Sequence, residues 1–171
     1  VIGKWHLVTE PAGFDYYNVI PAQGQFFDCR MKETGHQWED REKGGIVQPG
    51  YLTEVITDKT IEWLSKRDKN KPFCLLVHHK APHTPYHYPE KYSKILADSI
   101  IPEPDNFDET FLGKNKGLEL GECKFSKLSN IVPTHFSSPY PDILEIGTQA
   151  YKKWAFQHIV KGYHRLVAAL D

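Results

Sequence analysis

The feature that most constrains the fold is a helical pattern that passes through a polar turn into an apolar run. Apolar side chains recur at helical spacing from Tyr51 to about Arg67, and Pro49-Gly50 marks the boundary before them. The run Phe73–Val77 has strand length and no alternation, which predicts a strand covered on both faces. Helix, turn and buried strand make half of a βαβ unit, so we predict an α/β sandwich with a mostly parallel central sheet.

The rest of the chain gives weaker structural signals. Residues 1–7 predict a short buried strand, whereas residues 14–50 are rich in aromatics, glycine and proline and predict irregular structure with room for one short hairpin. Scattered prolines predict a surface excursion over residues 98–148. From about Thr148 to Asp171 one apolar stripe at helical spacing predicts a helix packed on a core: Phe156, Ile159, Val160, Tyr163, Leu166, Val167 and Leu170.

Composition limits the classes of partner. The 171 residues carry 21 basic and 22 acidic side chains, a formal charge of -1, so no global field favours nucleic acid or acidic lipids. We therefore predict no nucleic-acid partner, and no apolar stretch is long enough to predict a membrane span. The first residues look like the inside of a strand and the last ones like the inside of a helix, so we expect an internal piece of a longer protein.

Two segments that pair lysine with histidine carry the chemistry. Gly3-Lys4-Trp5-His6-Leu7 ends the first predicted strand, and Lys80-Ala81-Pro82-His83-Thr84-Pro85 follows the apolar run. Ligands of open α/β sheets gather beyond the carboxyl ends of the strands, so we expect both segments at one edge of the sheet. The sequence thus predicts a local site for an anion.

The residue types suit acid–base work on such an anion. In an extended segment Lys4 and His6 project to one side, about 7 Å apart, while Trp5 projects to the other. The ammonium would offset charge on an oxyanion, and the imidazole could take or give a proton. Pro82 would hold His83 in a fixed position, as a general acid requires. The alternative is a solvated lysine and a histidine at the edge of the core.

Metal and thiol chemistry have less support. Four histidines fall within ten residues, at positions 78, 79, 83 and 87, but helical ligand spacing is improbable next to Pro82, Pro85 and Pro89. We therefore predict no metal ligands in this chain. The segment Cys123-Lys124-Phe125-Ser126-Lys127 partly matches C-x-P-S-R but lacks its proline and its arginine. Cys29 and Cys123 are therefore interpreted as ordinary cysteines.

Several of these motifs, in this order, resemble the type I sulfatases. They are Gly-Lys-Trp-His-Leu, Gly-Phe-Asp-Tyr-Tyr at 13–17, the helix that begins at Tyr51, and the Lys-Pro-Phe strand that ends in Lys-Ala-Pro-His. The resemblance runs from Val1 to about Pro104 and resumes in the final helix, and its closest members are bacterial and glycosaminoglycan sulfatases. It implies an alkaline-phosphatase-like α/β/α sandwich, hydrolysis of sulfate esters, and a periplasmic or secreted protein.

The resemblance also implies roles for single residues. Lys4 looks like the lysine that steadies the nucleophile and the sulfate oxygens, and His6 like the base that releases sulfate from the enzyme. His83 looks like the acid that protonates the leaving alcohol, and Lys80 like a sulfate contact. Such enzymes use a formylglycine, made from Cys or Ser in C-x-P/A-S-R, whose hydrate attacks sulfur. They also bind a calcium ion through several carboxylates.

The chain departs from the family pattern in what it lacks. It contains neither the C-x-P/A-S-R nucleophile nor the paired aspartates of the family's early segment, nor the later Asp-Asn metal ligands. Val8 stands where the family usually has glycine. We therefore interpret residues 1–171 as an incomplete catalytic domain, with its nucleophile and calcium ligands outside the chain, and we expect it to be inactive alone.

Three functions remain open from the sequence. The first is a sulfatase of sulfated carbohydrate, for which Tyr16, Tyr17, Gln25, Phe26 and Phe27 could line a sugar subsite, although buried packing explains those rings equally well. The second is a phosphatase or phosphodiesterase of the same superfold with a different nucleophile. The third is a non-catalytic carbohydrate-binding homologue.

Overall fold

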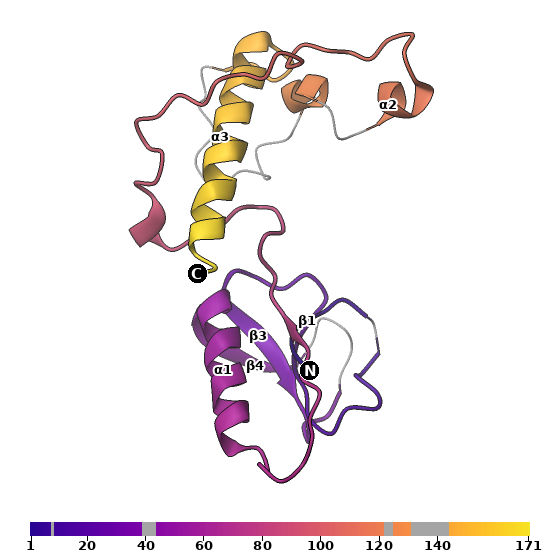
Figure 1. The fold of residues 1–171 in the computed structure, drawn as a ribbon, viewed down its shortest axis with the longest axis vertical. Helices are drawn as coiled ribbons and strands as arrows, with labels where there is room; N and C mark the ends of the chain where they lie inside the picture. The colour runs from indigo at the N-terminus through magenta and orange to yellow at the C-terminus, as the bar shows by residue number, and fades with distance from the viewer. Residues whose placement is uncertain (8, 39–43, 122–124, 131–143) are drawn as a thin grey trace. The chain divides into compact units, whose positions relative to one another are not determined.

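The chain forms two compact units. The computed structural model describes residues 1–7, 9–38, 44–121, 125–130 and 144–171, and it divides into Val1–Pro82 and His83–Ala169 (Figure 1). The first unit holds the sheet with one helix, and the second is built on a single long helix. None of the helices in these ranges is long and apolar enough to cross a bilayer.

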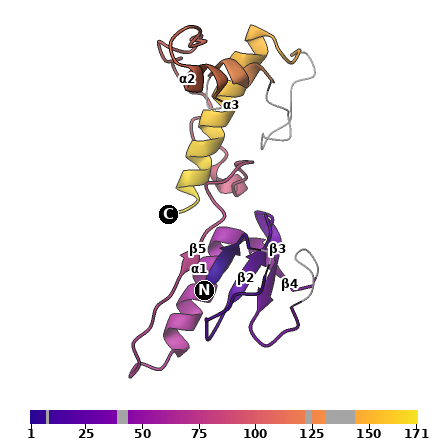
Figure 2. The same ribbon diagram turned by 90° about the vertical axis from the view of Figure 1, so that its right-hand side faces the viewer.

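The first unit is a mixed sheet of five strands in the order β4-β3-β2-β1-β5 (Figure 2). The strands are β1 (Ile2–Trp5), β2 (Asn18–Pro21), β3 (Phe27–Glu33), β4 (Ile46–Tyr51) and β5 (Val77–His78). β1 pairs in parallel with both β2 and β5, whereas β3 and β4 extend the sheet by antiparallel pairing. The predicted α/β fold is confirmed; among the described strands the sheet is mixed, since two of its four pairings are parallel, both with β1, and two are antiparallel.

The prediction for residues 14–50 was incomplete. The region contains β2, β3 and most of β4, which is more strand than the one short hairpin expected there, and these strands are joined by irregular segments. Alternation is present in β3, where Cys29 and Met31 point into the core, but a register shift between Phe27 and Cys29 breaks it near the strand's start. β4 contains Pro49, which an edge strand tolerates because its outer N–H groups have no ladder partner.

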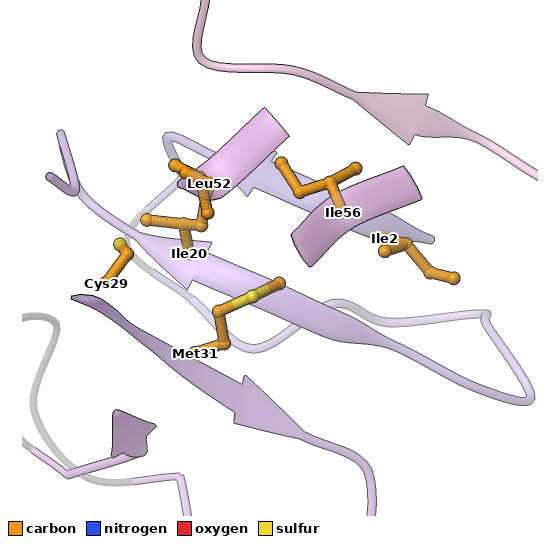
Figure 3. Close-up of a cluster of buried hydrophobic side chains, with 6 residues drawn as sticks. All are labelled: Ile2, Ile20, Cys29, Met31, Leu52 and Ile56. Carbon is orange, nitrogen blue, oxygen red and sulfur yellow. The ribbon is translucent and has the colours of Figure 1, made fainter. Parts of the chain in front are cut away.

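Helix α1 (Leu52–Lys66) covers one face of the sheet, as the periodicity predicted. Figure 3 shows its residues Leu52 and Ile56 facing side chains of β1, β2 and β3. The buried cluster contains Ile2, Ile20, Cys29, Met31, Leu52 and Ile56. On the other face Val1, Tyr17 and Val19 are buried, with Trp5, Phe14 and Trp38 packed against them. Both faces are apolar, so the strands are held between two packed layers.

The apolar run at residues 73–77 differs from its prediction. Only its last residue belongs to β5, and Phe73 and Leu76 are exposed while Leu75 packs partly against the core. β5 stands at the end of the strand order, so β1 is its partner on one side; Ile2 N donates to Leu76 O at 2.9 Å. An apolar run therefore does not establish burial on both faces, because that depends on neighbours distant in sequence.

The second unit is organised by α3 (Gln149–Ala168), which confirms the helix predicted near the end of the chain. The shorter elements are η1 (Glu90–Tyr92), α2 (Lys116–Leu120) and η2 (Phe125–Asn130). Thr148 caps α3 because its hydroxyl accepts from Tyr151 N at 3.2 Å. The predicted buried face of this helix was only partly right. Phe156 and Leu166 are buried, but Tyr163 and Val167 are exposed, and Lys152, which the apolar stripe did not include, is buried.

Candidate functional site

The carboxyl ends of the parallel strands bring together two of the predicted segments and one residue that was not predicted. Lys4 and His6 lie at the end of β1, Gln23 follows β2, and Lys80 follows β5. These strands are parallel neighbours, so their ends share one edge of the sheet. The prediction that Lys4, His6 and Lys80 gather at this edge is thereby supported by contacts within the first unit.

Gln23 connects these three basic residues. Its side-chain Oε1 accepts a hydrogen bond from Lys4 Nζ at 2.8 Å, and its Nε2 lies 3.4 Å from His6 Nε2. Its backbone carbonyl accepts from Lys80 Nζ at 2.9 Å. One residue therefore sets the positions of two ammonium groups and faces one imidazole.

The two lysines lie in a partly buried, positively charged environment. Lys80 is 7% exposed, and its Nζ lies 4.8 Å from the centroid of the Phe26 ring. Burial lowers the pKa of Lys80, and the nearby Lys4 lowers it further. Burial also lowers the pKa of Lys4. A bound oxyanion would reverse these shifts, because an opposite charge favours the ammonium form.

The local backbone of β1 explains the directions of its side chains. Trp5 packs on the sheet face opposite the α1 cluster, with its ring 6.0 Å from that of Phe14, while Lys4 and His6 turn to Gln23. This confirms the predicted alternation along the strand. His78 Nδ1 lies 3.2 Å from Lys4 O, so a side chain of β5 also contacts the backbone beside the site.

His83 begins the second unit. The peptide bonds before Pro82 and Pro85 are both cis, and His83 Nδ1 contacts the carbonyl of Thr84. The side chain is exposed, which suits a proton donor that must reach a substrate. Its meeting with Lys4 and His6 stays a prediction.

The structure also places Cys29 and several of the aromatic residues that were considered for a sugar subsite. Cys29 is buried in the core, and burial raises the pKa of its thiol, which disfavours the nucleophilic thiolate. Cys123 lies outside the described residues, as does Val8. Among the aromatic residues considered for a sugar subsite, Tyr17 and Phe26 are buried, and the exposed Phe27 packs on Tyr51 with ring centroids 5.2 Å apart.

The described residues contain no group of three or more histidine, cysteine or acidic side chains that could hold a metal ion. His79 is half-buried, and burial lowers its pKa. A calcium site of the kind that the family resemblance implies therefore does not fit the residues placed in this structure.

Gln23 was missed because its strand was missed. The segment Pro21-Ala22-Gln23-Gly24 continues from the end of β2, at the same edge of the sheet where β1 ends beside Lys4. With residues 18–21 assigned as a parallel strand, the rule that sites form beyond carboxyl ends would have selected this loop.

Known proteins similar to this chain point in one direction. The N-acetylglucosamine-6-O-sulfatase of Bacteroides thetaiotaomicron is 41% identical over 119 residues, which cover 68% of this chain and 20% of that protein. The N-acetylglucosamine-6-sulfatase of Homo sapiens is 23% identical over 114 residues, 67% of this chain and 20% of that protein. The chain thus spans about a fifth of the length of these curated relatives.

The fold gives the same indication. A solved protein in complex with its substrate, D-glucosamine-2-N,6-O-disulfate, matches 99% of this chain and 41% of its own chain, with a TM-score of 0.70 and 26% identity. The family model described as "Sulfatase" matches residues 1–166, nearly the whole chain. This chain therefore belongs to the sulfatase family.

Proposed function

We propose that the protein that contains this chain hydrolyses sulfate esters of amino sugars, with the 6-O-sulfate of an N-acetylglucosamine unit as the substrate class. The observation that carries the proposal is the cluster of Lys4, His6 and Lys80 around Gln23, in a chain of the sulfatase family. The named relatives act on 6-sulfated N-acetylglucosamine, and the solved structure holds a 6-O-sulfated glucosamine. These names support the choice of sugar.

The two lysines would bind the sulfate group. Each ammonium has three N–H donors, and Gln23 uses one donor of Lys4 and one of Lys80. Their other donors would meet oxyanion charge as it grows in the transition state, where such fixed donors lower the barrier most. Burial lowers the pKa of both lysines, and the charge of Lys4 lowers that of Lys80 further; a bound anion would oppose these shifts.

The two histidines would move protons. His6 is proposed as the base that takes a proton when sulfate is released, and His83 as the acid that gives a proton to the leaving alcohol oxygen. A sugar alkoxide is a poor leaving group, so protonation in the transition state matters more for it than for a phenolate.

The nucleophile and the metal of the proposed enzyme are not assigned to this chain. Formylglycine would supply the covalent nucleophile, but no cysteine of this sequence lies in C-x-P/A-S-R. Calcium does not fit the described residues, which contain no group of three or more histidine, cysteine or acidic side chains that could hold it. What this chain would contribute is the anion-binding and proton-transfer side of the site.

Sulfate release from N-acetylglucosamine-6-O-sulfate by the parent protein tests the proposal. Lys4→Ala is expected to lower kcat/KM about 100-fold or more, because a charge-stabilising donor is lost. Lys66→Ala is the matched control, since that lysine is 72% exposed on α1 and should leave kcat/KM unchanged. If the parent protein hydrolysed the corresponding phosphate ester but not the sulfate ester, a phosphatase would be favoured. If it bound the sugar and hydrolysed neither ester, a binding homologue would be favoured.

The acid role of His83 makes a separate prediction. His83→Ala should lower kcat/KM about 100-fold or more on the sugar sulfate and much less on an activated aryl sulfate, because an aryl oxygen leaves without protonation. His36→Ala, at an exposed histidine after β3, serves as the control. Equal losses on both substrates would contradict the role of His83 as an acid.

A further inference from the structure

We propose that Gln23 is a positioning residue of this site, whose side-chain amide holds His6 as the neutral tautomer with an unprotonated Nε2. The tautomer follows from the contacts alone. Only the role of that tautomer as a base rests on the function proposed above. The side chains concerned are those of Lys4, Gln23 and His6, which lie together at the ends of β1 and β2.

The orientation of the amide is fixed by Lys4. An ammonium has three donors and no acceptor, so the amide atom that it contacts must be the oxygen. Lys4 Nζ lies 2.8 Å from Oε1, an ordinary hydrogen-bond distance. The NH₂ group must then be the end that faces His6. Rotating the amide by half a turn would place NH₂ against the ammonium, donor against donor, and is excluded for that reason.

The orientation of the amide in turn selects the state of His6. The Nε2 atoms of Gln23 and His6 are 3.4 Å apart. An N–H group there requires an acceptor, and imidazole Nε2 accepts only when it carries no proton. The neutral ring with its proton on Nδ1 meets this requirement. Both the charged ring and the other neutral tautomer would place an N–H against the amide N–H.

This state is the one that a base requires. A base needs a lone pair on the nitrogen that faces the reaction, and taking a proton forms an N–H bond at Nε2 while the hydroxyl O–H bond breaks. At 3.4 Å the contact with the amide is long and therefore weak. Gln23 can thus define the tautomer of His6 before the reaction. Because the contact is weak, the lone pair on Nε2 can still turn from the amide to a substrate hydroxyl.

The surrounding charges act in the same direction. Lys4 lies two residues before His6, within the end of β1, and Lys80 follows β5. From the α1 side the contacts with the sheet core are made by the apolar Leu52 and Ile56. Neighbouring cations disfavour the charged imidazolium, so they also favour the neutral ring.

The test is ¹⁵N NMR of the imidazole nitrogens in the full chain labelled at histidine, with the His6 signals assigned by their loss in His6→Asn. At a pH above the titration midpoint of His6, the expected spectrum shows Nε2 of this ring without a proton and Nδ1 with one. In Gln23→Ala the share of Nε2-protonated ring should rise clearly. Gln25→Ala, in the same loop, is the matched control and should leave the His6 signals unchanged, because there it is the backbone N–H that contacts Cys29 Sγ.

A second variant separates positioning from simple packing. Gln23→Glu keeps the acceptor for Lys4 but places an acceptor in front of His6, which favours the protonated ring. The titration midpoint of His6 should move to higher pH by roughly one unit, with the fold retained. A proton on Nε2 of His6 in the unaltered chain, or the same tautomer ratio and midpoint in both Gln23 variants, would overturn the proposal. Because neither readout is turnover, failure here is distinct from failure of the proposed sulfatase activity.

Discussion

At the scale of single residues, Gly3 shows how closely the backbone of the site is packed. Its φ is +107°, and a Cβ atom added there would lie 2.0 Å from His78 O of β5. Real side chains do not approach a backbone oxygen so closely, so β1 and β5 can pair at this point only through a glycine. Gly3 therefore sets the distance between the strand that carries Lys4 and the strand that leads to Lys80.

Gly3→Ala should lower the free energy of unfolding by about 2–5 kcal/mol, since a positive-φ penalty of about 1–2 kcal/mol adds to an overpacking cost of about 1–3 kcal/mol. Gly13→Ala is the control, because Gly13 has φ +82° but no atom within 4 Å of the added Cβ. That variant should lose only about 1–2 kcal/mol. Urea unfolding followed by tryptophan fluorescence measures both, and equal losses would show that the contact with His78 is not the limiting feature.

At the scale of elements, α3 holds an irregular segment through polar side chains. Successive turns of the helix bind successive carbonyl groups of residues 95–107, in reversed order along the chain. The four contacts are Arg165 Nε to Ile95 O at 2.9 Å, Lys161 Nζ to Ala97 O at 3.2 Å, Gln157 Nε2 to Ile101 O at 2.7 Å and Lys152 Nζ to Phe107 O at 2.7 Å. Side chains of the helix thereby supply hydrogen bonds to backbone carbonyl groups of a segment that has no helix or strand partner for them.

Gln157 makes the most complete of these contacts, because its Oε1 also accepts from Ile101 N at 3.0 Å. Gln157→Ala should lower the free energy of unfolding of the second unit by about 1–3 kcal/mol, as two hydrogen bonds are lost. It should also speed hydrogen exchange at the Ile101 amide. Lys153→Ala on the same helix removes a surface ion pair with Glu103 and should cost less than about 1 kcal/mol. Unchanged exchange at Ile101 in Gln157→Ala would contradict this account.

At the scale of the whole molecule, the chain combines a cluster of basic side chains with a sequence that has no C-x-P/A-S-R motif. The first unit carries a basic cluster suited to an oxyanion, but no cysteine of the sequence stands in the C-x-P/A-S-R nucleophile motif. The described residues likewise include no cluster of three or more histidine, cysteine or acidic side chains that could hold calcium. Binding of an anion requires basic groups, whereas hydrolysis of a sulfate ester through a covalent intermediate also requires a nucleophile.

The purified 171-residue chain should release no inorganic sulfate from N-acetylglucosamine-6-O-sulfate, because stabilising donors cannot replace a missing nucleophile. Ion chromatography of released sulfate measures this, with the parent protein as the positive control. Sulfate release by the chain alone, above that of a Lys4→Ala variant, would show that the nucleophile lies within these residues.

The sequence by itself determined the features that depend on local periodicity and local chemistry. Helices α1 and α3, strand β1 and the two lysine–histidine segments were visible because each pattern repeats within a few residues. Only the tertiary structure decided which segments become neighbours. It paired β2 with β1 and so brought Gln23 to Lys4, His6 and Lys80, it left much of the run at 73–77 exposed, and it buried Lys152 in place of Tyr163. These outcomes depend on contacts between residues far apart in the chain, which no local pattern specifies.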